Sequence, residues 1–166
     1  MSTTLPVPIE FRLPEGWLPA PPDAVNAPGV AFVALHPHPD AGFTANITIE
    51  GEFLSEAATL EGLADASVQN LHEVAESVVV AHRREIGSED SPGLTQRLTF
   101  SAVAGGARRD LVQSHVYLAM VDAKDPHKRA VIKMVLTATE AQHDSVLGDF
   151  QEFLRTVRPD TGAEEG

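Results

Sequence analysis

The chain of 166 residues contains no cysteine. This absence excludes disulfide bonds, thiolate metal sites, iron–sulfur clusters and thiol catalysis, and it is compatible with a reducing cytoplasm. Aromatic residues are also few, at 5%, with a single tryptophan and a single tyrosine. No apolar run approaches the roughly 20 residues that a membrane-spanning helix needs, so we expect no membrane partner.

Targeting and catalytic motifs are missing as well. The first residues lack the basic and apolar regions of a signal peptide, which predicts a cytoplasmic protein. The sequence has no Gly-x-Ser-x-Gly nucleophile motif, no Walker phosphate loop and no Gly-x-Gly-x-x-Gly fingerprint. We therefore expect a protein that is not an enzyme and that holds no cofactor or resident metal.

Basic residues are scarce relative to acidic ones. The 24 acidic and 12 basic residues give a formal net charge of -12. Such a chain repels phosphates at long range, so we expect no nucleic-acid partner. With 43% hydrophobic residues, the chain can build a sizeable core as a single domain.

The first half of the chain changes from a strand pattern to a helix pattern. Residues 7–13 alternate apolar and polar and predict an edge strand, where proline is tolerated. Residues 30–35 and 43–49 predict a hairpin with a longer loop. The period then changes near Ser55, the predicted N-cap of an amphipathic helix whose apolar stripe continues to residue 74.

Four strands and a helix are predicted in the second half. The strands cover residues 77–86, 94–103, 109–121 and 129–137. Both faces of the last strand are apolar, so we place it centrally and covered on both sides. Thr139 and Gln142 fit a capping box that opens the final helix, and Pro159 stops it.

The order of elements is three strands, a helix, four strands and a helix. Because hairpin connections dominate, including a glycine turn at residues 104–107, we expect an α+β fold. Its sheet is mainly antiparallel, and its two major helices pack on that sheet. We expect one domain over residues 1–160 and a mobile polar tail over 161–166.

Four features carry a family resemblance: residues 11–17 (FRLPEGW), the strand ending in residues 45–49 (ANITI), the strand meander over 94–137, and the helix end at 153–157 (FLRTV). Together they resemble the Mog1/PsbP-like α/β/α sandwich, and within it the actinobacterial LpqN/LpqT-type group, over roughly residues 7–158. The resemblance implies a non-enzymatic binding partner, adaptor or assembly factor. Many actinobacterial members are secreted lipoproteins, whereas this sequence contains no cysteine for a lipobox and we expect no signal peptide.

Five arginines lie on, or directly before, three consecutive predicted strands: Arg83, Arg84, Arg97, Arg108 and Arg109. If these strands are neighbours, the arginines form a basic patch that binds an acidic partner or a phosphate-bearing ligand. The alternative, which we favour, is that they pair across strands with Glu85, Asp90 or Asp110. Both interpretations are open. Trp17 is either a core anchor or an exposed contact with a partner.

Three polar groups have residue types that suit a site. His36, His38 and Asp40 could hold a metal, or they belong to an ordinary surface loop. His72 and Glu76 are four residues apart, which predicts an exposed pair on one helical face, and the second histidine of a zinc-protease helix is absent. The third group shares one strand face and lines either a polar pocket or a face open to solvent: Gln113, His115 and Tyr117.

The sequence favours a non-catalytic binding or adaptor protein that holds a protein partner. Its contact surface would be the sheet edge, the proline-rich segment 19–28 or the arginine-bearing strands. The alternative is a small-ligand-binding domain or an unrecognised enzyme with a pocket between helix and sheet. Association of identical chains through an exposed strand edge is a third hypothesis.

Overall fold

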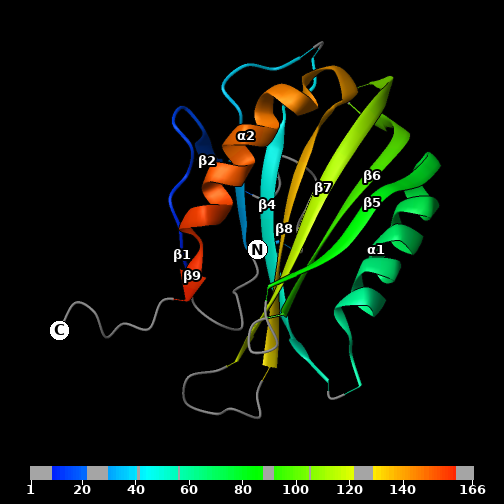
Figure 1. The fold of residues 1–166 in the computed structure, drawn as a ribbon. Helices are drawn as coiled ribbons and strands as arrows, with labels where there is room; N and C mark the ends of the chain where they lie inside the picture. The colour runs from blue at the N-terminus through cyan, green and yellow to red at the C-terminus, as the bar shows by residue number, and fades with distance from the viewer. Residues whose placement is uncertain are drawn as a thin grey trace.

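The computed structural model describes residues 9–21, 30–40, 42–55, 57–87, 92–104, 106–121 and 129–159. These residues form two helices, α1 (Leu60–Val74) and α2 (Glu140–Thr156), a small two-stranded sheet and a seven-stranded sheet (Figure 1). In spatial order, the large sheet consists of β2 (Leu18–Ala20), β3 (Phe32–Leu35), β4 (Asn46–Leu54), β8 (Arg129–Thr139), β7 (Ala107–Val121), β6 (Pro92–Ala104) and β5 (Glu76–Gly87). All its pairings are antiparallel, and the predicted α+β class and order of elements are confirmed, with two short strands added.

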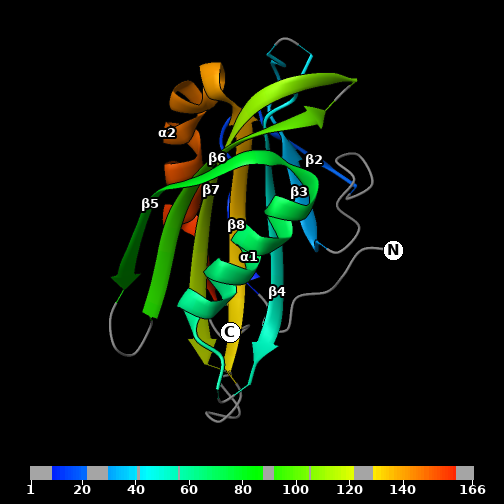
Figure 2. The same cartoon turned by 90° about the vertical axis from the view of Figure 1, so that its right-hand side faces the viewer.

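The two helices lie on opposite faces of the large sheet (Figures 1 and 2). α2 packs on β4, β7 and β8 with an apolar face that includes Val146, Phe150 and Phe153, each 1% exposed. α1 lies on the other face toward β5 and β6 and buries only Ala64 fully. The main apolar core therefore lies under α2, and the face under α1 has room for polar side chains. Neither described helix is long and apolar enough to cross a membrane.

The predicted central strand is confirmed. β8 is fourth of the seven strands and pairs with β4 on one side and β7 on the other. Residues on both of its faces are buried, which is why residues 129–137 read as nearly continuously apolar.

The N-terminal strand differs from the prediction. Within residues 7–13, β1 covers only Ile9–Glu10, and residues 7 and 8 lie outside the described range. β1 pairs with β9 (Arg158–Pro159) in the small sheet and not along the edge of the large sheet. A turn from Pro14 to Trp17, with Gly16 at φ 87°, redirects the chain, so β2 takes the edge position beside β3.

α1 begins later than predicted. The Ser55 carbonyl accepts a hydrogen bond from the Ala58 N–H at 3.1 Å, which makes a turn before the helix. Thr59 is the N-cap, and its hydroxyl accepts from the Gly62 N–H at 2.9 Å. Thr59 therefore provides the capping oxygen that we had expected from Ser55.

α2 begins at the predicted N-cap, with half of the predicted capping box. The Thr139 hydroxyl accepts from the Gln142 N–H at 3.2 Å and donates to Asp40 Oδ2 at 2.5 Å. The Gln142 side chain does not return to the N-cap, because its Nε2 donates to the His38 carbonyl at 2.9 Å. These bonds tie the start of α2 to the loop before β4. The predicted mobile tail at 161–166 lies outside the described residues, as does the proline-rich segment beyond residue 21.

Candidate functional site

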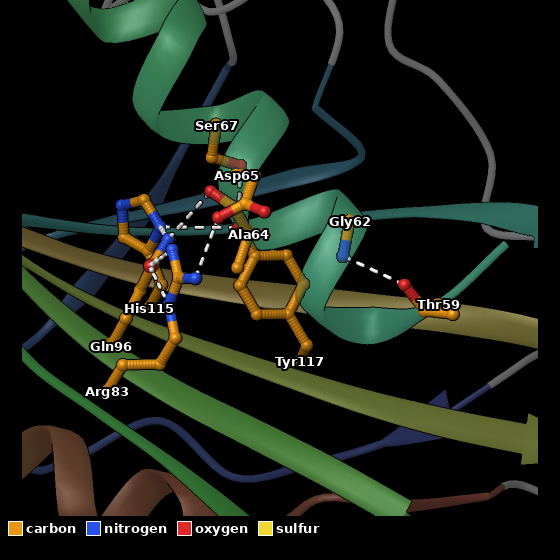
Figure 3. Close-up of polar contacts among 9 residues, drawn as sticks. All are labelled: Thr59, Gly62, Ala64, Asp65, Ser67, Arg83, Gln96, His115 and Tyr117. Atoms are coloured by element: carbon orange, nitrogen blue, oxygen red, sulfur yellow. Dashed lines mark hydrogen bonds and ion pairs between the residues drawn. The ribbon is translucent and has the colours of Figure 1, made fainter.

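A row of polar side chains crosses the sheet face under α1 (Figure 3). Register places Arg83 of β5 beside Gln96 of β6, and Gln96 beside His115 of β7. Directly paired residues in antiparallel strands point to the same face, so the three side chains form one line beneath the helix. Gln96 and His115 are each 2% exposed, which makes their hydrogen bonds decisive for the stability of this region.

Gln96 connects the sheet to α1. Its Oε1 accepts from Arg83 Nε at 3.1 Å and Nη2 at 2.8 Å. The amide nitrogen therefore faces the Ala64 carbonyl of α1 at 3.2 Å and His115 Nδ1 at 3.3 Å. Arg83 also donates from Nη1 to Asp65 Oδ1 of α1 at 2.7 Å, so one guanidinium joins strand and helix.

The neighbours of His115 fix its tautomer. Gln113 donates from its Nε2 to Thr137 Oγ1 at 3.2 Å, which leaves its Oε1 as the acceptor 2.8 Å from His115 Nε2. His115 therefore carries its proton on Nε2 and accepts at Nδ1. Burial, and then the positive charge of Lys133, lower the pKa of His115 to about 3, so the ring is neutral at physiological pH.

Tyr117 lies two residues beyond His115 on β7, on the same face, and belongs to this polar cluster. Its hydroxyl oxygen lies 2.6 Å from Ser67 Oγ of α1 and 3.4 Å from His115 Nδ1. Burial raises the pKa of Tyr117 to about 12, so the phenol stays protonated. Lys133 Nζ donates to Ser67 Oγ at 2.9 Å and lies 5.7 Å from the centre of the Tyr117 ring. A neutral buried histidine and a neutral phenol hold α1 on the sheet but are poor bases at neutral pH.

The shared face of Gln113, His115 and Tyr117 is not open to solvent. His115 and Tyr117 are both 2% exposed beneath α1, so the open-face interpretation is wrong. Tyr117 also lines a cavity of about 310 Å³ between α1 and the sheet, as the pocket interpretation expected for this residue. Sequence reasoning missed Gln96 and Lys133. A signal for Lys133 existed, because it is a charged residue in the middle of an otherwise apolar stretch, residues 130–136 of the central strand.

The five predicted arginines divide between the two faces of the sheet. Arg83 lies under α1, whereas Arg84 pairs with Thr95 and Arg97 pairs with Ser114 on the opposite face. Ser114 Oγ lies 2.9 Å from His143 Nε2 of α2, which identifies that face as the one α2 packs on. Arg84 is exposed and Arg97 is half-buried, and neither forms an ion pair with a residue that the structure describes.

The remaining two arginines, Arg108 and Arg109, lie at the N-terminal end of β7. Arg108 alternates onto the face of Arg84 and Arg97 and pairs with Glu76 at 2.9 Å, with both side chains exposed. Arg109 points to the other face, where its Nη2 approaches Gly42. Among the five arginines, Arg83 pairs with Asp65 and Arg108 pairs with Glu76. Neither ion pair uses the predicted acidic partners Glu85 and Asp110, and the third predicted partner, Asp90, lies outside the described residues.

Trp17 is a core residue and not an exposed contact. It is 4% exposed, its Nε1 donates to Asp149 Oδ2 of α2 at 3.0 Å, and its ring packs edge-on against His36. His36 Nδ1 accepts from the His38 N–H at 3.1 Å, while Asp40 is held by Thr139. These residues therefore do not converge on a metal, and the described part of the chain contains no cluster of three or more metal-ligating side chains.

His72 and Glu76 do not share a helical face. α1 ends at Val74, and Glu76 is the first residue of β5, where it pairs with Arg108. The predicted pair is wrong because the helix ends between its two members.

The fold matches solved structures at low sequence identity. LpqN, involved in cell envelope biogenesis of Mycobacterium tuberculosis, matches with a TM-score of 0.65 and 12% identity over 96% of this chain and 89% of that chain. Yeast (Saccharomyces cerevisiae) Ran-binding protein Mog1p matches with a TM-score of 0.55 and 13% identity over 91% and 89%. The chain has the Mog1/PsbP-like fold.

Cyanobacterial PsbP from Synechocystis belongs to the same set of Mog1/PsbP-like structures. It matches with a TM-score of 0.58 and 14% identity over 92% of this chain and 86% of that chain. No protein-family model matches the sequence, and no curated protein matches it. The predicted resemblance to the Mog1/PsbP-like fold, with LpqN among its members, is confirmed at the level of the fold.

Proposed function

We propose that this protein is a non-catalytic binding protein that holds an acidic protein partner on the face of β5 and β6 that carries Arg84 and Arg97. The observation behind the proposal is the presence of two arginines without ion pairs among the described residues, in a chain of net charge -12. His82 pairs with Arg97 in register on this surface, which we call the arginine face.

Complementary charge favours an acidic partner on this surface. Arginine presents a planar fork of donors that fits carboxylates in two-point contacts. The strongly acidic remainder of the chain repels polyanions at long range, which argues for a protein with a local acidic patch and against a nucleic acid. A second copy of the chain fits less well, because antiparallel pairing of two β5 edges about Arg84 would place Arg84 opposite Arg84.

The polar cluster under α1 supports the non-catalytic part of the proposal. His115 and Tyr117 are neutral at physiological pH, buried, and occupied by hydrogen bonds to Gln96, Gln113 and Ser67. Among proteins of this fold, Mog1p is described as a Ran-binding protein, so the fold is compatible with holding a protein partner. A cytoplasmic location is part of the proposal and suits a chain without cysteine.

Affinity capture from a lysate of the source organism tests this proposal. The tagged wild type is compared with Arg84→Glu/Arg97→Glu and with a control of equal charge change, Arg12→Glu/Arg155→Glu, whose arginines are exposed elsewhere. We expect one stoichiometric partner, retained by the control and lost by the first variant, with binding that weakens at high salt. A partner that both variants retain would refute the arginine face as its site.

A further inference from the structure

A second candidate site lies on the other face of the sheet, independent of the arginine face. The cavity of about 310 Å³ lies between α1 and the strands β4, β7 and β8. Leu63 and Ala66 of α1 and Val131 of β8 provide apolar walls. Apolar walls with a few placed polar groups, at this volume, are typical of sites for small ligands.

Lys133 provides a cation that lines this cavity. It lies on the central strand, and its side chain is only 21% exposed. An ammonium has three N–H donors, of which one donates to Ser67 Oγ at 2.9 Å and another faces Glu50 Oε1 at 3.5 Å. No third acceptor for Lys133 occurs among the residues that the structure describes, so one donor is available to an anion in the cavity.

The Ser67 hydroxyl holds this ammonium in place. Ser67 Oγ accepts from Lys133. It also lies 2.6 Å from the Tyr117 hydroxyl, which is itself fixed under α1 (Figure 3). The orientation of Lys133 is therefore set by the protein before any ligand binds, which lowers the entropic cost of binding.

Glu52 provides an anion in the cavity lining. It is exposed and forms no ion pair with a described residue. Glu52 pairs with Val131 in register, whereas Glu50 pairs with Lys133. Glu50, which lies opposite Lys133, and Glu52 are two residues apart along β4, so their backbone positions are about 6.6 Å apart. A small molecule with opposite charges at its two polar groups can span that distance.

We propose that this cavity binds a free amino acid with an aliphatic side chain. The ligand carboxylate accepts from Lys133 Nζ, its ammonium donates to Glu52, and its side chain packs on Leu63, Ala66 and Val131. A purely anionic ligand would be repelled by Glu50 and Glu52. A purely cationic ligand would leave the available N–H donor of Lys133 without an acceptor.

Two-dimensional amide NMR of the whole chain with L-leucine as the probe tests this site. We expect saturable shifts of amides in β4 and β8 around Glu52 and Lys133. Two matched compounds, 4-methylpentanoate without the ammonium and 3-methylbutylamine without the carboxylate, should bind at least about ten-fold more weakly. Absence of saturable shifts with L-leucine up to about 10 mM, a concentration that detects even millimolar affinity, would overturn the proposal.

Variants separate this site from a general effect on the fold. Glu52→Gln keeps the shape of an exposed side chain, so the fold should persist while leucine affinity falls at least about ten-fold. The control Glu152→Gln on α2 should bind like the wild type. Lys133→Met keeps the apolar stem and should abolish binding, and if that variant does not fold, Glu52→Gln remains decisive. Wild-type affinity in Glu52→Gln would refute the assignment.

Discussion

The protonation state of His115 has a measurable consequence for stability. Its pKa in the folded protein is about 3, first because of burial and then because of the charge of Lys133, whereas the unfolded chain has the ordinary value near 6.5. Below pH 6.5 the unfolded state therefore binds a proton that the folded state does not. The free energy of unfolding must fall as the pH falls from about 6.5 toward 3, and this contribution is absent above pH 6.5.

The magnitude follows from the linkage relation. Within the window the slope approaches 1.4 kcal/mol per pH unit, so His115 alone should cost about 2 kcal/mol of stability between pH 7 and pH 5. Urea unfolding at the two pH values, for the wild type and His115→Gln, measures it. The glutamine variant does not titrate, so its loss of stability on acidification should be smaller by about 2 kcal/mol.

The double difference matters because other groups, His143 among them, titrate in both proteins. Any stability change caused by the substitution itself cancels when each protein is compared with itself at the two pH values. Equal losses in both proteins would refute the reasoning. So would an NMR titration in which the His115 ring gains its proton near pH 6.5.

Three further predictions concern the side of the sheet that α2 packs on. Phe150→Ala should destabilise the protein by about 3–5 kcal/mol in urea unfolding, because Phe150 is 1% exposed in the main core. The control Leu18→Ala, at a residue that is 64% exposed, should change stability by less than about 0.5 kcal/mol. Similar effects of the two substitutions would contradict the assigned core. Arg97→Ala should raise the pKa of His143 in an NMR titration, because the Arg97 charge is a cause, second to burial, of its lowered pKa; an unchanged or lower pKa would place Arg97 elsewhere. Thr139→Ala should cost about 1 kcal/mol in thermal unfolding, because it removes the N-cap of α2, and no loss would show that another group caps the helix.

Local patterns predicted the parts of the fold that depend on burial of whole segments. β8 was predicted to be central because its residues are apolar on both faces. A strand that is buried on both sides has a nearly continuous apolar run, whereas a strand with one face in solvent alternates apolar and polar residues. α2 was predicted from its N-cap and apolar stripe, which are properties of consecutive residues. Both predictions can be made without knowing which strands are neighbours.

The candidate sites depend on the register between strands, which local sequence patterns do not reveal. The row of Arg83, Gln96 and His115 exists because β5 shifts its register between Val80 and His82, an irregularity with no local signal. The split of the arginines was partly predictable, since Arg83 and Arg84 are adjacent and adjacent strand residues face opposite ways.

The end of α1 shows a second limit of sequence reasoning. The apolar stripe continues to Val74, but nothing in the spacing of His72 and Glu76 shows that the helix ends between them. Helix ends depend on tertiary contacts as much as on local sequence, so the pair was placed on one helical face wrongly.

Site-specific photo-crosslinking in cells of the source organism tests the arginine face most directly. A photoreactive residue at Thr99, half-buried on the same sheet face beside Val79, is compared with one at Glu152, exposed on α2. We predict one discrete crosslinked protein from position 99, lost when Arg84→Glu/Arg97→Glu is added, and none from position 152. The same crosslinked species from both positions, or one that persists in the arginine variant, would contradict a partner site on this face.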